Sequence, residues 1–224
     1  MNVTKDKISS VFFQYSIPAV LGMLAISSAN IVDGFFIGNY VGDFGLAAIN
    51  ITFPIFSLLF GFALMLAIGS SVVSRKLIGQ GDIKSASMIF SKTMVCITLF
   101  SFITCTGLFL NIETVLYLFG ADENLTKIAI EYLSVILIFI PFLMIGVVLD
   151  YFVRVDNRPN LAFIALLSSA LINVILDWFL IVYLQKGIFG AALATGISQL
   201  ALIFILLPHF FSKKATLKFV KPIG

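Results

Sequence analysis

The sequence predicts an all-α protein that crosses a membrane six times. Hydrophobic residues make up 60% of the chain, charged residues make up 11%, and the mean hydropathy is +1.12. A soluble domain is about 45–50% apolar and about 25% charged, so we expect lipid to surround most of this chain. The formal net charge of +3 carries little information by itself, and we expect no nucleic-acid partner.

Six apolar runs are each long enough to cross a bilayer, which takes about 20 residues. They cover approximately residues 11–37, 46–74, 86–110, 127–153, 160–183 and 188–208. Each of the first five ends in a connection that carries turn-forming or charged residues; in order, these are GNYVGDFG, RKLIGQGDIKS, NIETVLYLFGADENLTK, RVDNRPN and LQKG. We therefore expect one transmembrane unit over residues 1–211, followed by a basic tail or connection over residues 212–224.

The basic residues predict how these helices are oriented. Twelve lie at the start of the chain, in the even-numbered turns or in the tail, namely Lys5, Lys7, Arg75, Lys76, Lys84, Lys92, Arg154, Arg158, Lys213, Lys214, Lys218 and Lys221. Only Lys127 and Lys186 lie on the other side. Because basic residues are retained in the cytoplasm, we expect a multi-pass plasma-membrane protein with both termini inside.

Aromatic residues mark the opposite, outer edge of the predicted bundle. They are Tyr40, Tyr117, Tyr132, Trp178 and Tyr183, and we interpret them as an interfacial belt. At the inner edge, we expect His209 to be a polar boundary residue, and Asp150 to meet water or Arg154.

Two carboxylates fall inside the apolar runs. Asp33 lies about one turn below the outer end of the first helix, and Asp177 about two turns below the outer end of the fifth, so their depths are similar. An acid near the centre of a spanning helix costs about 2.5–3.5 kcal/mol on insertion scales, and such residues usually line a pathway or a relay. Because desolvation and a second carboxylate both disfavour ionisation, the pair is a candidate proton or sodium site.

Polar side chains accompany both acids at helical spacing. Ser169 and Asn173 precede Asp177 at intervals of four, Asn30 precedes Asp33 by three, and Thr195 and Gln199 form a similar stripe on the sixth helix. Such stripes need a partner or water opposite them, because an unpaired polar group in hydrocarbon costs several kcal/mol. Pro18, with Gly22 after it, predicts a kink or a hinge in the first helix.

Several stretches resemble one transporter family. SIPAVLGML and NIVDGFFIGNYVGDFGLAAINITFPI are similar to the first two helices of the multidrug and toxic compound extrusion (MATE) family, and RKLIGQGDIKSAS is similar to its first cytoplasmic turn. RVDNRPNLA, LINVILDWFLIV and GIFGAALATGISQ resemble its fourth to sixth helices, in the manner of DinF-like prokaryotic members. In the RVDNRPN turn, Asn157 replaces the glycine that the family pattern predicts.

The resemblance implies a secondary active transporter, not an enzyme, that exports organic, often cationic, drugs or xenobiotics in exchange for H⁺ or Na⁺. It implies a coupling site at Asp33, Asn173, Asp177 and Thr195, with Pro18 at a bend in the first helix and Asn30, Ser169 and Gln199 as supporting polar residues. Two carboxylates, an amide oxygen and a hydroxyl are hard oxygen donors that can hold Na⁺ or pass a proton. We expect no cofactor beyond the coupling ion.

Family members have about twelve helices in two similar lobes, and the chain has six runs. We therefore expect a second six-helix lobe, either on a longer form of the same chain or from a second copy. The tail resembles the basic cytoplasmic connection between the lobes.

Three alternatives stay open. A flippase for lipid-linked precursors would need basic residues deep in the spans, where the chain has none. An intramembrane aspartyl protease could also use two membrane aspartates, but NIVDGFF and VILDWFL lack the Gly-x-Gly-Asp pattern of those enzymes. A membrane assembly protein without transport activity would not need two acids at one depth.

Overall fold

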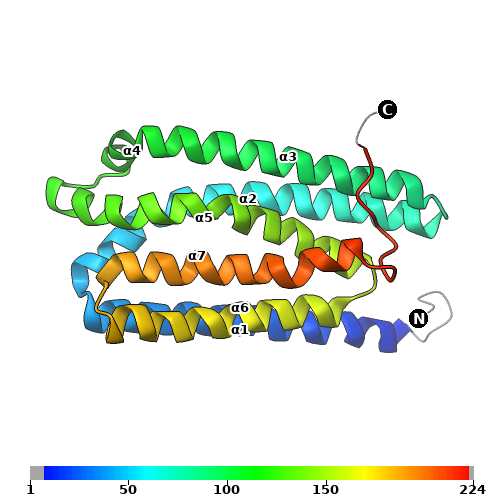
Figure 1. Ribbon diagram of the computed structural model, residues 1–224, viewed down its shortest axis with the longest axis horizontal. Coiled ribbons are helices and arrows are strands. Elements are labelled where there is room, and N and C mark those ends of the chain that lie inside the picture. The colour runs from blue at the N-terminus through cyan, green and yellow to red at the C-terminus, as the bar shows by residue number, and fades with distance from the viewer. Residues whose placement is uncertain (1–7, 222–224) are drawn as a thin grey trace.

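In the computed structural model, which describes residues 8–221, six long helices lie side by side as one bundle (Figure 1). They are α1 (Ile8–Tyr40), α2 (Asp43–Gly79), α3 (Ile83–Leu110), α5 (Glu123–Val155), α6 (Pro159–Asp177) and α7 (Gly187–Leu206). A π-helical turn, η1 (Trp178–Tyr183), continues α6, and a 3-10 turn, η2 (Leu207–Phe211), continues α7. Six helices long and apolar enough to cross a membrane occur among these residues, which confirms the predicted all-α fold with six spans.

The bundle has two ends that differ in charge. The terminal end holds the start of α1, the α2–α3 and α5–α6 turns and the last described residues, and the distal end holds the α1–α2 turn and the η1–α7 turn (Figure 1). The basic residues predicted on the cytoplasmic side lie in or near the segments of the terminal end, except that Lys5 and Lys7 fall outside the described residues.

Helix α5 is the centre of the fold. It packs against α2, α3 and α7, while α6 packs between α1 and α7. The sequence of α5 is apolar on all sides, so residues around its whole circumference are buried, including Leu133, Ile140, Val148 and Phe152. The packing order therefore runs from α1 through α6, α7, α5 and α2 to α3, which places the acids of α1 and α6 on neighbouring helices.

The connections show why the helices begin where they do. Asp82 caps α3 by accepting a hydrogen bond from the Ser85 backbone amide at 3.0 Å, and hydrogen bonding from Ser85 holds the pKa of this carboxyl below its ordinary value. Asp122 caps α5 in the same way through the Leu125 amide at 2.7 Å. The connection before α5, which we predicted as a turn, contains a short helix of its own, α4 (Ile112–Leu118).

The last described residues pack on the bundle. Within this C-terminal segment (residues 212–221), the backbone amides of Lys218 and Val220 donate to the hydroxyls of Ser87 and Ser91 on α3, at 3.3 and 2.9 Å. Ala215 and Leu217 are buried. A segment predicted from its charge as a tail or connection is thus attached along α3 by hydrogen bonds and apolar contacts.

The prediction for His209 was wrong. Its side chain is buried and lies 2.6 Å from the buried carboxylate of Asp156, which also accepts the Thr216 backbone amide at 3.0 and 3.1 Å. A polar residue at a membrane boundary would reach toward water, but the C-terminal segment covers His209 from that side. The Asp150 carboxylate pairs with the Arg154 guanidinium at 3.0 Å. Of the two partners expected for Asp150, water and Arg154, the structure shows Arg154.

Candidate functional site

The two membrane acids come from neighbouring helices near the distal end. Asp33 lies on α1, and Asp177 is the last residue of α6 before η1 begins. Their carboxylates lie within electrostatic reach of each other and of the Tyr132 hydroxyl on α5. Three helices thus bring two acids and a phenol to one place.

These carboxylates stand out because their oxygens lack partners. Asp177 has no solvent exposure, and Asp33 is half-buried. Among the described residues, the buried side-chain polar atoms without a hydrogen-bond partner are both carboxylate oxygens of Asp177, one of Asp33 and the Ser74 hydroxyl. Since buried polar groups are normally hydrogen-bonded and buried charges paired, this arrangement favours a site that takes up a proton or a cation.

The backbone changes at Asp177. The six residues that follow it form the wider π-helical turn, in which the Leu184 amide donates to the Phe179 carbonyl at 2.9 Å. Single π-helical turns inside helices occur frequently at functional sites. The turn begins directly after Asp177 with the exposed Trp178 and ends with the exposed Tyr183, so it leads from the buried acid to the exposed aromatic residues.

A small polar cavity lies one turn closer to the terminal end than the acids. Its volume is about 60 Å³, and its polar lining includes Asn30 from α1, Ser169 and Asn173 from α6, and Thr195 and Gln199 from α7. A water molecule or a bare monovalent cation would fit in this volume. The structure therefore brings the five predicted polar residues together at one cavity and places Asp33 and Asp177 just beyond it.

Hydrogen bonds across this cavity join α6 to α7. The Asn173 side-chain amide donates to the Thr195 hydroxyl at 3.5 Å, and the Ser169 hydroxyl donates to the Ser198 carbonyl at 2.8 Å. The first distance is long, so this hydrogen bond is weak, and it does not involve the Asn173 side-chain oxygen. Pro18, the predicted bend, lies inside α1 and is buried.

Apolar packing covers the distal side of the acids. Ile37 from α1, Ile181 from η1, and Ile188 and Ala191 from α7 form a buried cluster, with Tyr132 packed against it. This cluster separates the acids from the distal end of the bundle. An ion or proton reaching the acids from that end would have to displace some of these side chains.

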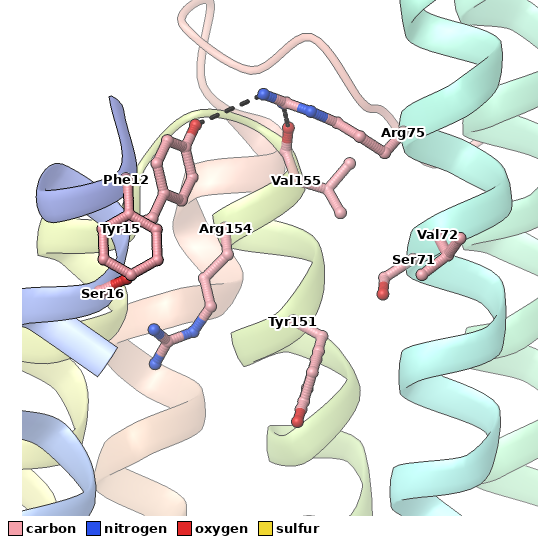
Figure 2. Close-up of a pocket in the computed structure, with 9 residues that line it drawn as sticks. All are labelled: Phe12, Tyr15, Ser16, Ser71, Val72, Arg75, Tyr151, Arg154 and Val155. Carbon is pink, nitrogen blue, oxygen red and sulfur yellow. Dashed lines mark hydrogen bonds between the residues drawn. The ribbon is translucent and has the colours of Figure 1, made fainter. Parts of the chain in front are cut away.

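A larger cavity of about 430 Å³ opens at the terminal end between α1, α2 and α5 (Figure 2). Arg75 of α2 donates to the Val155 carbonyl at 2.5 Å and to the Asn157 side chain at 2.9 Å, and it lies 3.5 Å from the Tyr15 hydroxyl. Tyr15 donates to the same Asn157 oxygen at 2.7 Å. This network connects α1 and α2 to the α5–α6 turn at the terminal end of the bundle, far from the two acids.

Tyr132 is the site residue that the sequence analysis assigned wrongly. We placed it in an interfacial belt with Trp178 and Tyr183, but its hydroxyl is near both acids and its ring packs inside the bundle. One signal could have found it: Ile136 and Ile140 follow Tyr132 at intervals of four, so the tyrosine shares its helix face with apolar residues that can pack inside the bundle.

Comparison with known proteins identifies the family. A family model described as MatE matches residues 18–179, which is well over half of the chain. The chain belongs to the MATE family. This confirms the resemblance, and it makes the chain a multi-pass membrane protein of a transporter family.

Two relatives are multidrug export proteins called MepA from staphylococci. The one from Staphylococcus saprophyticus is 28% identical over 222 residues, which is 96% of this chain and 49% of the relative. The one from Staphylococcus haemolyticus is 31% identical over 218 residues, which is 94% of this chain and 47% of the relative. These relatives are transporters and not enzymes, in agreement with the prediction that this chain is not an enzyme.

The fold is also similar to that of solved MATE proteins. A crystal structure of a MATE protein in complex with MaD3S superposes with a TM-score of 0.87 at 25% identity, covering 92% of this chain and 47% of that one. The chain therefore spans about half the length of the MATE proteins it matches.

Proposed function

We propose that this chain is one lobe of a cation-coupled antiporter, which exports organic, mainly cationic, drugs or xenobiotics in exchange for H⁺ or Na⁺. The observation that carries the proposal is the pair of membrane acids, with the Asp177 carboxylate buried and both of its oxygens without hydrogen-bond partners. The names of the staphylococcal relatives support export of drugs as the transport task.

In this proposal, the coupling site consists of Asp33, Asn173, Asp177 and Thr195, with Asn30, Ser169 and Gln199 as supporting polar residues and Tyr132 as an added hydroxyl. A proton on the acids, or Na⁺ held by their oxygens together with the Asn173 amide and the Thr195 hydroxyl, removes the cost of a buried negative charge. Because α1 supplies one acid and α6 the other, occupancy changes how well these helices pack together.

The site can bias transport only if it is occupied differently in two conformations. A ligand shifts an equilibrium by its differential affinity for the two states, so the coupling ion must bind one packing of α1 against α6 more tightly than the other. Pro18 is placed to let α1 adopt these two packings, because proline interrupts the hydrogen-bond ladder of a helix. We propose that ion binding favours the conformation that releases the drug outside the cell.

The proposed location is the plasma membrane, with both termini and the terminal end of the bundle in the cytoplasm. The excess of basic residues in the turns of that end supports this orientation. The apolar cluster around Ile181 then faces the outside and covers the acids, and the second lobe completes the pathway for the drug.

The test is gradient-driven efflux of a lipophilic cationic dye by the full protein in vesicles, comparing Asp177→Asn with the unchanged protein. We expect Asp177→Asn to abolish efflux, because asparagine can neither take up the proton nor supply the carboxylate. We also expect unchanged or higher thermal stability, because the substitution removes an acid whose oxygens have no hydrogen-bond partner. Imposing a pH gradient without sodium, and a sodium gradient without a pH difference, identifies the coupling ion.

The matched control is Glu131→Gln, which removes an exposed acid from the same half of the bundle and should leave efflux unchanged. Efflux by Asp177→Asn at the normal rate would contradict the coupling role. Loss of efflux together with loss of folding would show that Asp177 is structural, and this too would contradict the proposal.

A further inference from the structure

A second cavity at the terminal end lies outside the proposed coupling site. Its volume is about 480 Å³, and it is bounded by Gln14 of α1, the α5–α6 turn, the first turns of α6 and Lys214 of the C-terminal segment. Three segments that are far apart in the sequence therefore meet around one space. None of the residues of the proposed coupling site lines it.

Two cations face this cavity from different segments. Arg158, in the α5–α6 turn, and Lys214 are both exposed, and neither takes part in the two ion pairs found among residues 8–221. Side-chain amides of Gln14, Asn157 and Asn160 add hydrogen-bond donors to the lining. This combination of an arginine, a lysine and amides suits a phosphate group, which accepts several hydrogen bonds and carries negative charge.

The one acid in the lining is already engaged. Asp156 is buried, and its oxygens accept the Thr216 backbone amide at 3.0 and 3.1 Å and lie 2.6 Å from the His209 ring. The same hydrogen bonds fix the chain two residues after Lys214. Asp156 therefore anchors the segment that carries Lys214 at the cavity that Arg158 also lines.

The cavity is polar at one side and apolar at the other. Pro159 begins α6, and Leu161 and Ile164 line the cavity along its first turns, with Ile164 52% exposed. In a membrane, this places the charged side at the level of the lipid head groups and the exposed Ile164 side chain in the hydrocarbon. A free phosphate ion would use only the charged side, whereas a phospholipid would use both.

We propose that this cavity binds the phosphate group of an anionic phospholipid from the membrane leaflet at the terminal end of the bundle. Arg158 and Lys214 contact the phosphate, and Leu161 and Ile164 lie along an acyl chain. Basic pockets between transmembrane helices at the cytoplasmic side are a recurring type of lipid site. The bound lipid would link α6 to the C-terminal segment. The proposal does not depend on the coupling role of Asp33 and Asp177.

The test is native mass spectrometry of the full protein in mild detergent, with phosphatidylglycerol and phosphatidylcholine of identical acyl chains added as competing probes. We expect the unchanged protein to retain phosphatidylglycerol preferentially, and Arg158→Gln with Lys214→Gln to reduce this preference about 25-fold, since each cation near an anionic lipid contributes about a factor of five. The matched control is Lys76→Gln with Lys84→Gln, which removes the same charge from exposed residues of the terminal end outside the cavity.

Three results would overturn the proposal. The unchanged protein could show no preference for phosphatidylglycerol, both double variants could lose the preference equally, or inorganic phosphate could displace the lipid, which would indicate a site for a free anion. Thermal unfolding of each variant checks that it is folded, and Arg158→Lys with Lys214→Arg should retain the preference because it keeps both charges. Because the measurement records binding alone, its outcome is independent of whether the protein transports drugs.

Discussion

At the scale of single residues, Asn157 combines a backbone role with a side-chain role. Its φ angle is 61°, in the left-handed region that favours glycine and then asparagine. Its side-chain oxygen accepts hydrogen bonds from Tyr15 of α1 and Arg75 of α2 at 2.7 and 2.9 Å. Glycine, which the family pattern predicts here, would suit the backbone but could not make this bridge.

Two substitutions separate these roles. Asn157→Gly and Asn157→Ala both remove the bridging oxygen. Only the alanine variant is also destabilised by the left-handed conformation, in which its Cβ atom costs about 1–2 kcal/mol. We therefore expect Asn157→Ala to unfold about 2–8 °C below Asn157→Gly in a thermal melt of the detergent-solubilised protein. Equal midpoints for the two variants would contradict the backbone role, and a glycine variant as stable as the unchanged protein would contradict the bridge.

At the scale of helices, α5 and α7 approach each other through glycines. A Cβ atom added at Gly196 of α7 would overlap the ring of Phe139 on α5, and one at Gly146 of α5 would lie 3.0 Å from Leu202 on α7. Small residues at helix crossings in membranes allow such close contact and the dispersion attraction that comes with it. The same two helices position Tyr132 and Thr195, so their spacing also sets the geometry of the candidate site.

Alanine substitutions test this close approach. We expect Gly196→Ala to destabilise the protein by about 1–3 kcal/mol, because the new methyl group forces Phe139 or the helix to move. Gly107→Ala on α3 is the matched control: its Cβ would meet open space, so the better helix propensity of alanine should leave stability unchanged or raise it by up to about 1 kcal/mol. Thermal melts that shift equally for the two variants would count against a tight α5–α7 contact.

The six helices could be predicted from the sequence because lipid imposes a length and a composition that soluble folds do not require. The polar residues around the cavity could be placed together because fixed helix geometry converts spacing into depth and face. Tyr132 was wrongly predicted to lie in the interfacial belt. An aromatic residue near the end of a membrane helix has the same position in the sequence whether its ring faces lipid or the interior of the bundle.

The features that the sequence did not predict depend on contacts between distant segments. His209 and Asp156 are 53 residues apart, and nothing in either local sequence indicates that they pair. The C-terminal segment attaches through backbone amides of Lys218 and Val220 to serine hydroxyls on α3, so its side-chain pattern carries no signal. Phe219 packs against Phe90 and stacks with Phe211, but a single phenylalanine in a basic segment is a weak indication of packing.

At the scale of the whole molecule, the bundle contains the complete proposed coupling site. In the same proposal, it forms only one side of the transport pathway. Much of α1 is exposed along its length, with Phe13, Leu24 and Phe35 among its exposed apolar residues. Lipid or a second bundle must cover such a surface in a membrane. Because the chain spans about half the length of its MATE relatives, we expect a second six-helix bundle in the working transporter.

The mass of the protein isolated from its native membrane tests this expectation. If the isolated chain has the 24.5 kDa of this sequence, we expect a complex of about twice that mass in native mass spectrometry, because two bundles are needed to enclose a drug between them. If the isolated chain is itself about twice as heavy, the second bundle is part of it, and the complex should contain one copy. Either result supports a two-lobe transporter. Efflux by a purified monomer of 24.5 kDa in vesicles would contradict it, because a single bundle would then provide both the coupling site and the complete pathway.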